Sequence, residues 1–389
     1  MHLSQFRSRY FALTALVPLL FAMLLSACGT TTSTSGPSNN APIEVGWIGP
    51  LSGVNAILGH WDTQGIELAI DGQNAKGGIH GRQIHLDKLD DAADPTQSIN
   101  DAQRLITQNH IVACFCTPNS GTTLAIEPLL TRNKIVQYTP GLAGNLTAKG
   151  SSYIFRDTPV GLAFENTLVT FLAQQKQFKS FAIITDTTDY GQGEATYQTQ
   201  TLQKFGLTPL TIQKYGANDT DFTGQLDAII AKHPQVLLFG GSEVASGLIA
   251  KQARRLGFTG QLAGGAAIGT PKFIQVAGTD IANGTYFSSA YINNDKNDQT
   301  KTFATAYQAK WHEAPEGHGA KAYDGAQLLI QALNTAYPNI TGDAISTAMH
   351  NIRNFQGLQG SVNYDTTGEG FHDTSVGVIK NGQLTPFFA

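Results

Sequence analysis

The sequence predicts an α/β fold built from parallel sheets and divided into two lobes. Short apolar runs rich in β-branched residues, such as 180–185 and 236–239, alternate with segments of helical periodicity. Apolar strands that alternate with helices are typical of parallel sheets covered on both faces. Without residues 1–27 the chain still exceeds the ~250–300 residues at which a single core usually divides, so we expect two lobes.

The expected elements follow in order along the chain. We expect strands at residues 43–48, 83–89, 111–115, 135–138, 180–185, 236–239 and 261–263. We expect helices at residues 64–76, 96–108, 122–132, 164–175, 193–205, 222–232 and 246–256. The first of these helices ends at Gly77-Gly78, which is a C-terminal stop signal.

The N-terminal segment has the pattern of a signal peptide with a lipidation site. Arg7 and Arg9 precede an apolar run over 11–25, which ends at Leu-Ser-Ala before Cys28 and resembles a bacterial lipobox. We expect a signal peptide at 1–27, a lipid on Cys28, and a flexible tether through residue 42, because 29–42 shows no apolar periodicity. The alternative is a short uncleaved anchor. Either predicts an extracytoplasmic protein held at the membrane.

Charge and motifs exclude several classes of function. The chain carries 25 Lys and Arg against 29 Asp and Glu, and it lacks the clustered basic footprint that nucleic-acid binding needs. It contains no G-x-S-x-G and no H-E-x-x-H, and His312 with His318 lacks metal-ligand spacing. We therefore expect no catalysis, no metal and no cofactor. A secreted hydrolase is the rejected alternative.

Cys114 and Cys116 are the cysteines that remain after Cys28. Two residues apart on a strand, they face the same side. A bridge between them would be strained, so the first interpretation is two buried free thiols. A strained disulfide and a metal or redox role remain the alternatives.

A polar, glycine-rich loop follows each of six expected strands. Ligands of parallel sheets bind at this edge, where glycine permits close approach and helix N-termini favour anions. The sequence therefore predicts a ligand cleft, although short turns of any α/β protein are also glycine-rich. The loops are 49–53, 116–121, 139–145, 186–193, 240–243 and 264–270.

Several of these loops match a known family. The chain resembles the type I periplasmic binding proteins, in the leucine/isoleucine/valine-binding branch of ABC-transporter receptors. The resemblance implies two Rossmann-like lobes with parallel sheets, joined by three hinge crossovers near 157–159, 288–291 and 360–364. Lobe 1 would span 43–158 plus 290–361, and lobe 2 would span 159–289 plus 362–389. The matching motifs are GPLSG at 49–53, NAKGGIHG at 74–81, DDAADP at 90–95, TPG at 139–141, DYG at 189–191, KQAR at 251–254 and AYD at 322–324.

The resemblance also implies a ligand site between the lobes. Ser120 would hold a ligand carboxylate, helped by its own N–H and by the turn of Gly141, Leu142 and Ala143. Tyr190 would close over the ligand from lobe 2. The alternatives are a helix N-cap for Ser120 and an ordinary turn residue for Tyr190.

Four further positions are implied less directly. Ser242 and Glu243 fall where the family places an aromatic contact, and Trp61 replaces a tryptophan expected near Leu58. His318 would line the cleft wall. The alternatives are a core or hinge aromatic for Trp61, a solvated acid for Glu243 and a surface position for His318.

Two departures from the family bear on the ligand. Amino-acid receptors place an acid at the position of Ala266 and a threonine at that of Ala143 to hold the ligand ammonium. An unpartnered buried ammonium costs roughly 3–5 kcal/mol. Either the ligand lacks an ammonium, as an amide, a urea-like compound or a carboxylic acid does, or Glu243 supplies the charge. Ala93 stands where some relatives carry a disulfide cysteine.

The resemblance implies a solute-binding receptor of an ABC importer. It would bind a branched-chain amino acid, an amide or urea-like compound, or a carboxylic acid, and close on it by a hinge motion. The partners would be the ligand, a membrane permease and, through Cys28, the membrane itself, with the receptor a monomer. A ligand-sensing or cell-envelope regulatory lipoprotein of the same fold is the alternative.

Overall fold

A computed structural model describes residues 41–293 and 298–387 of the protein. The expected signal peptide, the lipidated Cys28 and nearly all of the tether lie outside the described residues. Within the described ranges, no helix combines the length and apolarity needed to cross a bilayer.

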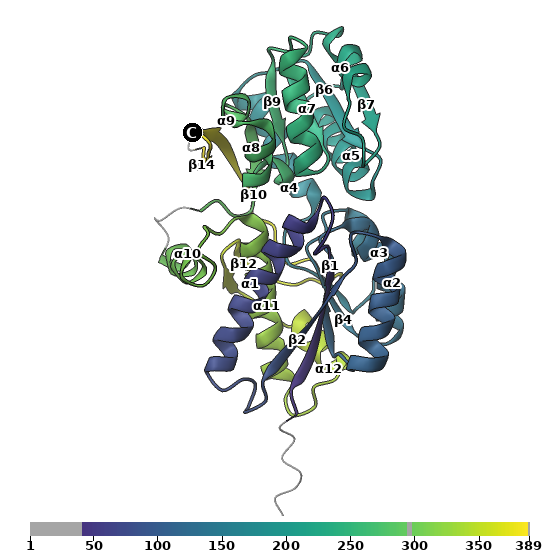
Figure 1. The fold of residues 1–389 in the computed structure, drawn as a ribbon, viewed down its shortest axis with the longest axis vertical. Helices are drawn as coiled ribbons and strands as arrows, with labels where there is room; N and C mark the ends of the chain where they lie inside the picture. Colours follow the sequence, from purple (N-terminus) through teal and green to yellow (C-terminus); the bar gives the residue numbers. More distant parts are fainter. Residues whose placement is uncertain (1–40, 294–297, 388–389) are drawn as a thin grey trace, which may run out of the picture. The chain divides into compact units, whose positions relative to one another are not determined.

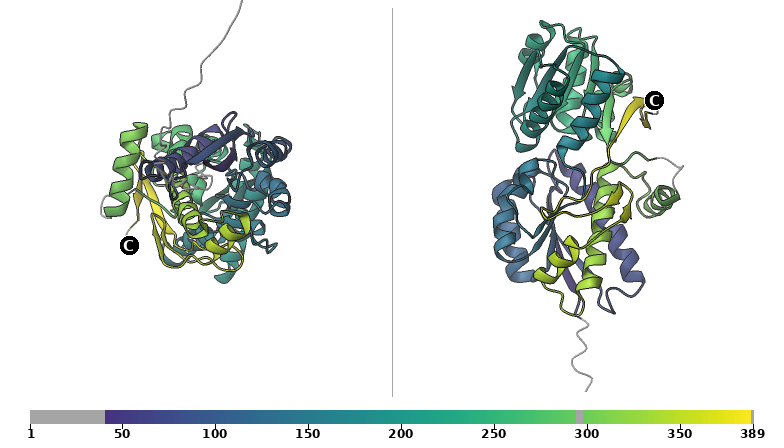
Figure 2. Two further views of the ribbon diagram at one scale, coloured as in Figure 1. Left: turned by 90° about the horizontal axis from the view of Figure 1, so that it is seen from below. Right: turned by 180° about the vertical axis from the view of Figure 1, so that it is seen from behind.

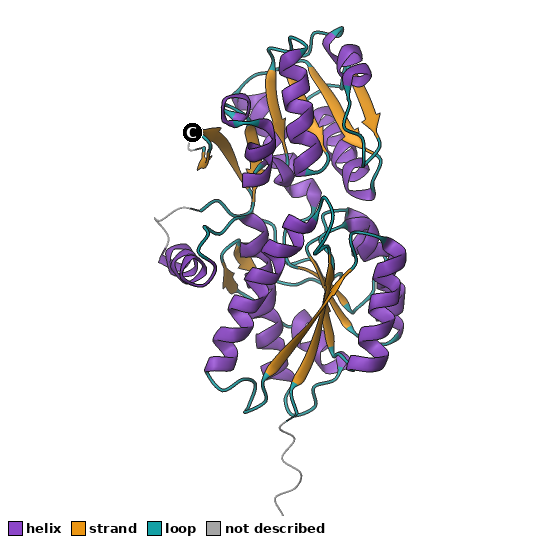
Figure 3. Ribbon diagram, in the orientation of Figure 1, coloured by secondary structure: helices purple, strands orange, loops and turns teal. Residues whose placement is uncertain are grey.

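The first sheet has five parallel strands in the order β2-β1-β3-β4-β5. Figure 3 shows it surrounded by helices. Four of its strands match the strands expected from the alternation of apolar runs and helices, whereas β5 was not expected. The bounds are β1 (Ile43–Gly49), β2 (Ile84–Asp90), β3 (Ala113–Phe115), β4 (Val136–Thr139) and β5 (Ile154–Arg156).

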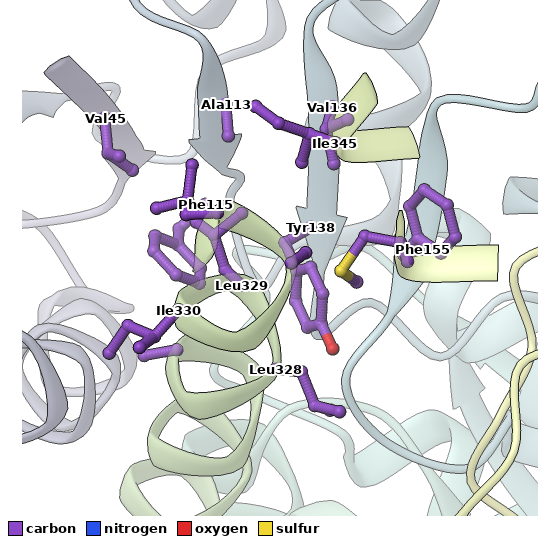
Figure 4. Packing of buried hydrophobic residues seen from close by; sticks show 14 of the residues in the cluster. Val45, Ala113, Phe115, Val136, Tyr138, Phe155, Leu328, Leu329, Ile330 and Ile345 are labelled. Atoms are coloured by element: carbon purple, nitrogen blue, oxygen red, sulfur yellow. The ribbon is translucent and has the colours of Figure 1, made fainter. Parts of the chain in front are cut away.

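Helices cover both faces of this sheet, because apolar residues of its strands point both ways. On one face, Phe115 and Tyr138 pack towards Leu329 of helix α11 (Gly317–Ala336), as Figure 4 shows. Helices α1 (Ala56–Ala75) and α12 (Gly342–His350) join the same core. On the other face, α2 (Pro95–Arg104) and α3 (Ser120–Arg132) pack against Ile48 and Cys114. Helices α11 and α12, from the C-terminal part of the chain, therefore cover a sheet that is built from its N-terminal part.

The second sheet has seven strands in the order β14-β13-β10-β9-β8-β6-β7. The strands from β7 to β10 are parallel, whereas β13 and β14 form an antiparallel edge that the sequence did not predict. The strand bounds are β6 (Phe181–Asp186), β7 (Thr211–Tyr215), β8 (Val236–Gly240), β9 (Gln261–Gly264), β10 (Tyr286–Ser289), β13 (Ser375–Lys380) and β14 (Gln383–Pro386). Its helices are α4 (Gly161–Thr170), α5 (Asp189–Lys204), α6 (Thr223–Ile230), α7 (Glu243–Arg255), α8 (Pro271–Ala277) and α9 (Thr279–Ala282).

The chain passes between the two sheets three times, which agrees with the predicted fold class. It leaves the first sheet between β5 and α4, returns after β10 to α10 (Asp298–Trp311), and leaves again after the hairpin of β11 (Phe355–Gly357) and β12 (Gly360–Val362). The colours of Figures 1 and 2 follow these passages, with yellow-green segments beside the purple and blue ones. The residue at which each lobe begins and ends stays a prediction.

Helix α1 begins at Ala56, not at residue 64 as expected from periodicity. Gly59 weakened the helical signal, because glycine lowers helix propensity. Tertiary packing explains that glycine: a Cβ at Gly59 would lie 1.9 Å from the Pro50 carbonyl oxygen. The helix therefore extends where the loop after β1 approaches it closely.

Asp324 of α11 ties this helix to the segment before the third crossover. Its carboxylate accepts the N–H groups of Leu358 at 2.9 Å and Gln359 at 3.0 Å. The side chain is 1% exposed, and burial raises its pKa to about 7. Because the folded pKa lies above the unfolded value of about 3.9, the native state retains a proton that the unfolded chain has lost between these values.

Asp324→Asn should therefore flatten part of the pH dependence of stability. The contribution of Asp324 is fully present below about pH 4 and is lost as the pH rises towards 7, by up to about 1.4 kcal/mol per pH unit. We expect the wild type to lose about 2 kcal/mol relative to this variant between pH 5 and pH 8, measured by urea unfolding. Asp343→Asn is the control, because Asp343 is exposed and Lys134 lowers its pKa. The prediction would be contradicted if the free energy of unfolding changed with pH in the same way for wild type and Asp324→Asn.

Candidate functional site

Ser120 and the turn over 141–143 meet at the carboxyl edge of the first sheet. Ser120 is the first residue of α3 and 2% exposed, and its Oγ accepts the N–H of Ala143 at 3.2 Å. A Cβ at Gly141 would lie 3.2 Å from the same Oγ. The N-cap of α3 is Asn119, so the alternative role of Ser120 as N-cap is not the one observed.

The Arg156 guanidinium binds two backbone carbonyls of this turn. Its Nη1 donates to the Gly141 carbonyl, and its Nη2 donates to the Ala143 carbonyl at 3.0 Å. Its Nε lies 3.0 Å from both carboxylate oxygens of Glu369. Arg156 therefore fixes the peptides on either side of the one whose N–H, that of Ala143, donates to Ser120. The Arg156 side chain is fully buried. Its role was not predicted from the sequence, because Arg156 lies outside the motifs that match the family.

Tyr190 lies in the first turn of α5, at the carboxyl edge of the second sheet. Its pKa is raised well above the usual range by burial and by the nearby acids Glu194, Glu243 and Glu165. Ser242 is the N-cap of α7 and accepts the N–H of Ala245 at 3.3 Å, so its hydroxyl is engaged locally. This side of the site is therefore rich in carboxyl groups.

His318 joins residues of the two sheets. Its Nε2 lies 3.5 Å from Glu243 Oε1 of α7, and its Nδ1 lies 4.0 Å from Asp62 Oδ1 of α1. The Trp61 ring stacks on it with centroids 5.8 Å apart. Burial and then Lys321 lower the pKa of His318 to about 4, so the ring is neutral near pH 7. The structure thus brings Trp61, Glu243 and His318 together, as one group of the predicted site.

A small cavity lies between the sheets and beside the crossovers. Leu142 and His318 contribute to it from the first sheet's side, and Ala266 contributes from the second. Its volume is about 30 Å³, which holds about two water molecules at ~10–15 Å³ each and is far below the ~300 Å³ of a small-molecule site. Binding a solute here requires the surrounding loops to move apart. The other lining residues are Thr158, Phe164, Gly269, Thr270, Ser289, Ala290, Tyr291, Gly317, Lys321 and Gln359.

Two buried acids next to Ala266 escaped the sequence analysis. Glu165 and Glu194 are 0% and 1% exposed, and a Cβ at Gly265 would lie 2.3 Å from Glu165 Oε1 and 2.7 Å from Glu194 Oε2. Burial raises the pKa of Glu165 to about 7, and burial with the Glu165 charge raises that of Glu194 well above its usual value. Glu194 follows Tyr190 by one helical turn and so lies on the same helix face, and this spacing could have identified it from the sequence. Two carboxyl groups therefore lie against Gly265, the residue before the position where the acid of the amino-acid receptors is absent.

The described residues contain one group with the spacing for a metal ion, and it lies elsewhere. Glu44, His85 and Asp87 place their ligand atoms within 4.8 Å of one another near the start of β1 and β2. His85 Nδ1 lies 2.6 Å from Glu44 Oε2, and this hydrogen bond raises the pKa of the ring. The group is explained as a partly exposed ion pair at the opposite end of the strands from Ser120.

Two α/β sheets linked by three crossovers, with polar loops at their carboxyl edges, define the class of two-lobed solute-binding proteins. The profile of the family described as periplasmic binding protein matches residues 42–383. The chain belongs to this family, which implies an extracytoplasmic location. Its members are binding proteins.

The relatives agree with this assignment. The Leu/Ile/Val-binding protein BraC3 of Rhizobium johnstonii is 28% identical over 334 residues, 86% of this chain and 90% of BraC3. The substrate-binding protein LivJ from Streptococcus pneumoniae, in complex with isoleucine, matches with a TM-score of 0.81 at 26% identity, over 88% of this chain and 97% of LivJ. A solute-binding protein from R. palustris in complex with benzoate shares the fold, with a TM-score of 0.82 at 18% identity over 89% and 95% of the two chains.

Arg156→Met should disrupt the turn and the fold together. The change leaves Glu369 and two carbonyl oxygens without their buried cation, and removal of one member of a buried pair costs about 3–5 kcal/mol. We expect this loss in urea unfolding. Lys134→Met is the matched control, because the Lys134–Asp343 pair is exposed and should contribute little. Equal, small effects of both changes would show that Arg156 does not hold the turn.

Proposed function

We propose that this protein is the solute-binding receptor of an ABC importer, anchored outside the cytoplasm through a lipid on Cys28. It binds a small polar carboxylate or amide between its lobes and presents the closed form to a membrane permease, acting as a monomer. The observation that carries the proposal is the Ser120 hydroxyl against the Arg156-held turn of 141–143. On the second sheet's side, Tyr190 lies among the carboxyl groups of Glu194, Glu243 and Glu165.

The ligand carboxylate would bind at Ser120 and the N-terminus of α3. Helix N-termini favour anions through their free N–H groups and the helix dipole. Isoleucine and benzoate, which occupy the pneumococcal and R. palustris proteins, are both carboxylates. The opposite end of the ligand would meet Tyr190 and the acids Glu194 and Glu243, which suit a hydrogen-bond donor.

The lobes would close by the exchange of open and closed states. The contact of His318 with Glu243 is made across the two sheets and would break when they separate. A ligand that touches both sides favours the closed form. A shift from 1:99 to 99:1 needs about 5.5 kcal/mol of differential binding, which a few charge-assisted hydrogen bonds at about 1.5–3 kcal/mol each supply.

Four matched compounds separate the ligand classes. Leucine, leucinamide, 4-methylpentanoate and 4-methylpentanamide share one side chain and differ only in the ammonium and in the carboxylate or amide. We expect 4-methylpentanoate or its amide to raise the melting temperature most, because no acid stands at Ala266. At 100 times the dissociation constant a ligand adds about 2.7 kcal/mol. Stabilisation by leucine alone would mean that Glu243, Glu165 or Glu194 supplies the counter-charge.

Ser120→Ala should weaken binding of the best carboxylate in this set. Loss of one hydrogen bond to a charged group costs about 1.5–3 kcal/mol, or roughly tenfold to a hundredfold in affinity by titration calorimetry. Thr341→Ala is the control: it removes the N-cap of α12, lowers stability by about 1 kcal/mol and should leave affinity unchanged. Undiminished affinity of Ser120→Ala would refute the role given to Ser120.

A further inference from the structure

Cys114 and Cys116 form a buried pair at the start of the candidate ligand loop, with Cys114 in β3 and Cys116 the first residue of the loop. They are 0% and 1% exposed, and both side chains pack on the face of the sheet that α2 and α3 cover. Their neighbours Ala113 and Phe115 point to the opposite face. The structure holds both as unbonded thiols with their Sγ atoms 2.8 Å apart, and it leaves open the alternative of a strained disulfide that the sequence also allowed. Cys28 is the one other cysteine of the chain.

The backbone geometry permits a bond between these sulfurs. A disulfide needs an S–S distance of about 2.04 Å and Cα atoms within about 4.4–6.8 Å. Two residues of extended chain span about 6.6 Å, at the upper end of that range. Cys116 lies one residue beyond the end of β3, and its N–H still donates to the Tyr138 carbonyl at 2.7 Å. The sulfurs lie 2.8 Å apart and must approach by a further ~0.8 Å to form the bond.

We propose that Cys114 and Cys116 are joined by a disulfide in the exported protein, and that this bond sets the position of the loop over 117–120. Both S–H bonds break and one S–S bond forms. The two electrons and two protons pass to a disulfide oxidant of the extracytoplasmic compartment, whose own disulfide becomes two thiols. Compartments outside the cytoplasm favour such oxidation, and family membership implies this location.

The bond would form while the sheet is still open. The attacking species is the thiolate, and burial raises the pKa of Cys116 well above its usual value. Exchange is therefore slow once α2 and α3 cover the pair. Because the ring is short and the Cα separation wide, the bond is strained, and strained disulfides are more readily reduced.

The loop is connected to the pair through Thr117. The Thr117 Oγ1 accepts the N–H of Asn119 at 3.3 Å and the hydroxyl of Thr122 at 3.0 Å. Its carbonyl accepts the hydroxyl of Thr123 at 2.9 Å. Ser120, which receives the Ala143 N–H, lies in the same short segment. Drawing Cys116 towards Cys114 therefore changes the anchor point of the loop that carries Ser120.

The redox state can be read by trapping the thiols. The full chain, expressed with its own leader and recovered from the cell envelope, is quenched in acid, denatured and treated with iodoacetamide without reductant. We expect the peptide that contains both cysteines to be unlabelled and lighter by two hydrogen atoms, and to take two labels after reduction. Two labels before reduction would overturn the proposal, whether the thiols had been free or had held a metal. Cys116→Ser is the control and should take one label with or without reductant.

Coupling to the loop is read by hydrogen exchange. We expect amides of 117–123 to exchange severalfold faster after reduction than before, while the segment 181–186 of the second sheet stays unchanged. If reduction unfolds the protein, Cys114→Ser and Cys116→Ser replace the reduced sample. Equal exchange at 117–123 in both states would overturn the link between the bond and the loop. Neither readout needs a ligand, so failure here is distinct from failure of the proposed function.

Discussion

The fully buried guanidinium of Arg156 is the interaction on which the site depends. It lies where β5 ends and the first crossover begins, and it binds the turn over 141–143 on one side and Glu369 on the other. Its own backbone belongs to the same junction, because its N–H donates to the Gly368 carbonyl and its carbonyl accepts the Tyr364 hydroxyl. One cation therefore fixes the turn of the candidate site relative to two of the three chain passages.

Such an arrangement constrains how the protein can move. A buried ion costs several kcal/mol to desolvate, so it must keep its partners in every state of the hinge. Arg156 and the turn are then expected to move as one rigid part. The contact between His318 and Glu243 is different in kind, because His318 is neutral near pH 7 and the two groups lie 3.5 Å apart. A weak contact of this type can break and reform at little cost.

The acids around the site form a second constraint. Burial raises the pKa of Asp62 to about 7 and that of Glu316 to about 8, and Lys321 offsets part of this cost on the first sheet's side. Glu165 and Glu194 on the second sheet's side have no ion pair with a cation among the residues described. A protein that retains so many buried carboxylates near one small cavity sacrifices stability at neutral pH. The distribution is typical of sites where polar groups are kept for binding.

The sequence by itself determined the α/β alternation and the six polar loops, because apolar period and glycine placement are local properties, and its motifs carried the resemblance to the two-lobed family. Through that resemblance it also offered Ser120, the turn at 141–143 and His318 as candidates. Tertiary structure alone decided the early start of α1, the antiparallel strands β13 and β14, and the roles of Arg156, Glu165 and Glu194. These depend on partners far away in the chain: Arg156 meets Glu369, and Gly265 leaves room for Glu165. Burial and charge pairing between distant segments leave no periodic trace in a sequence, so only the folded chain reveals them.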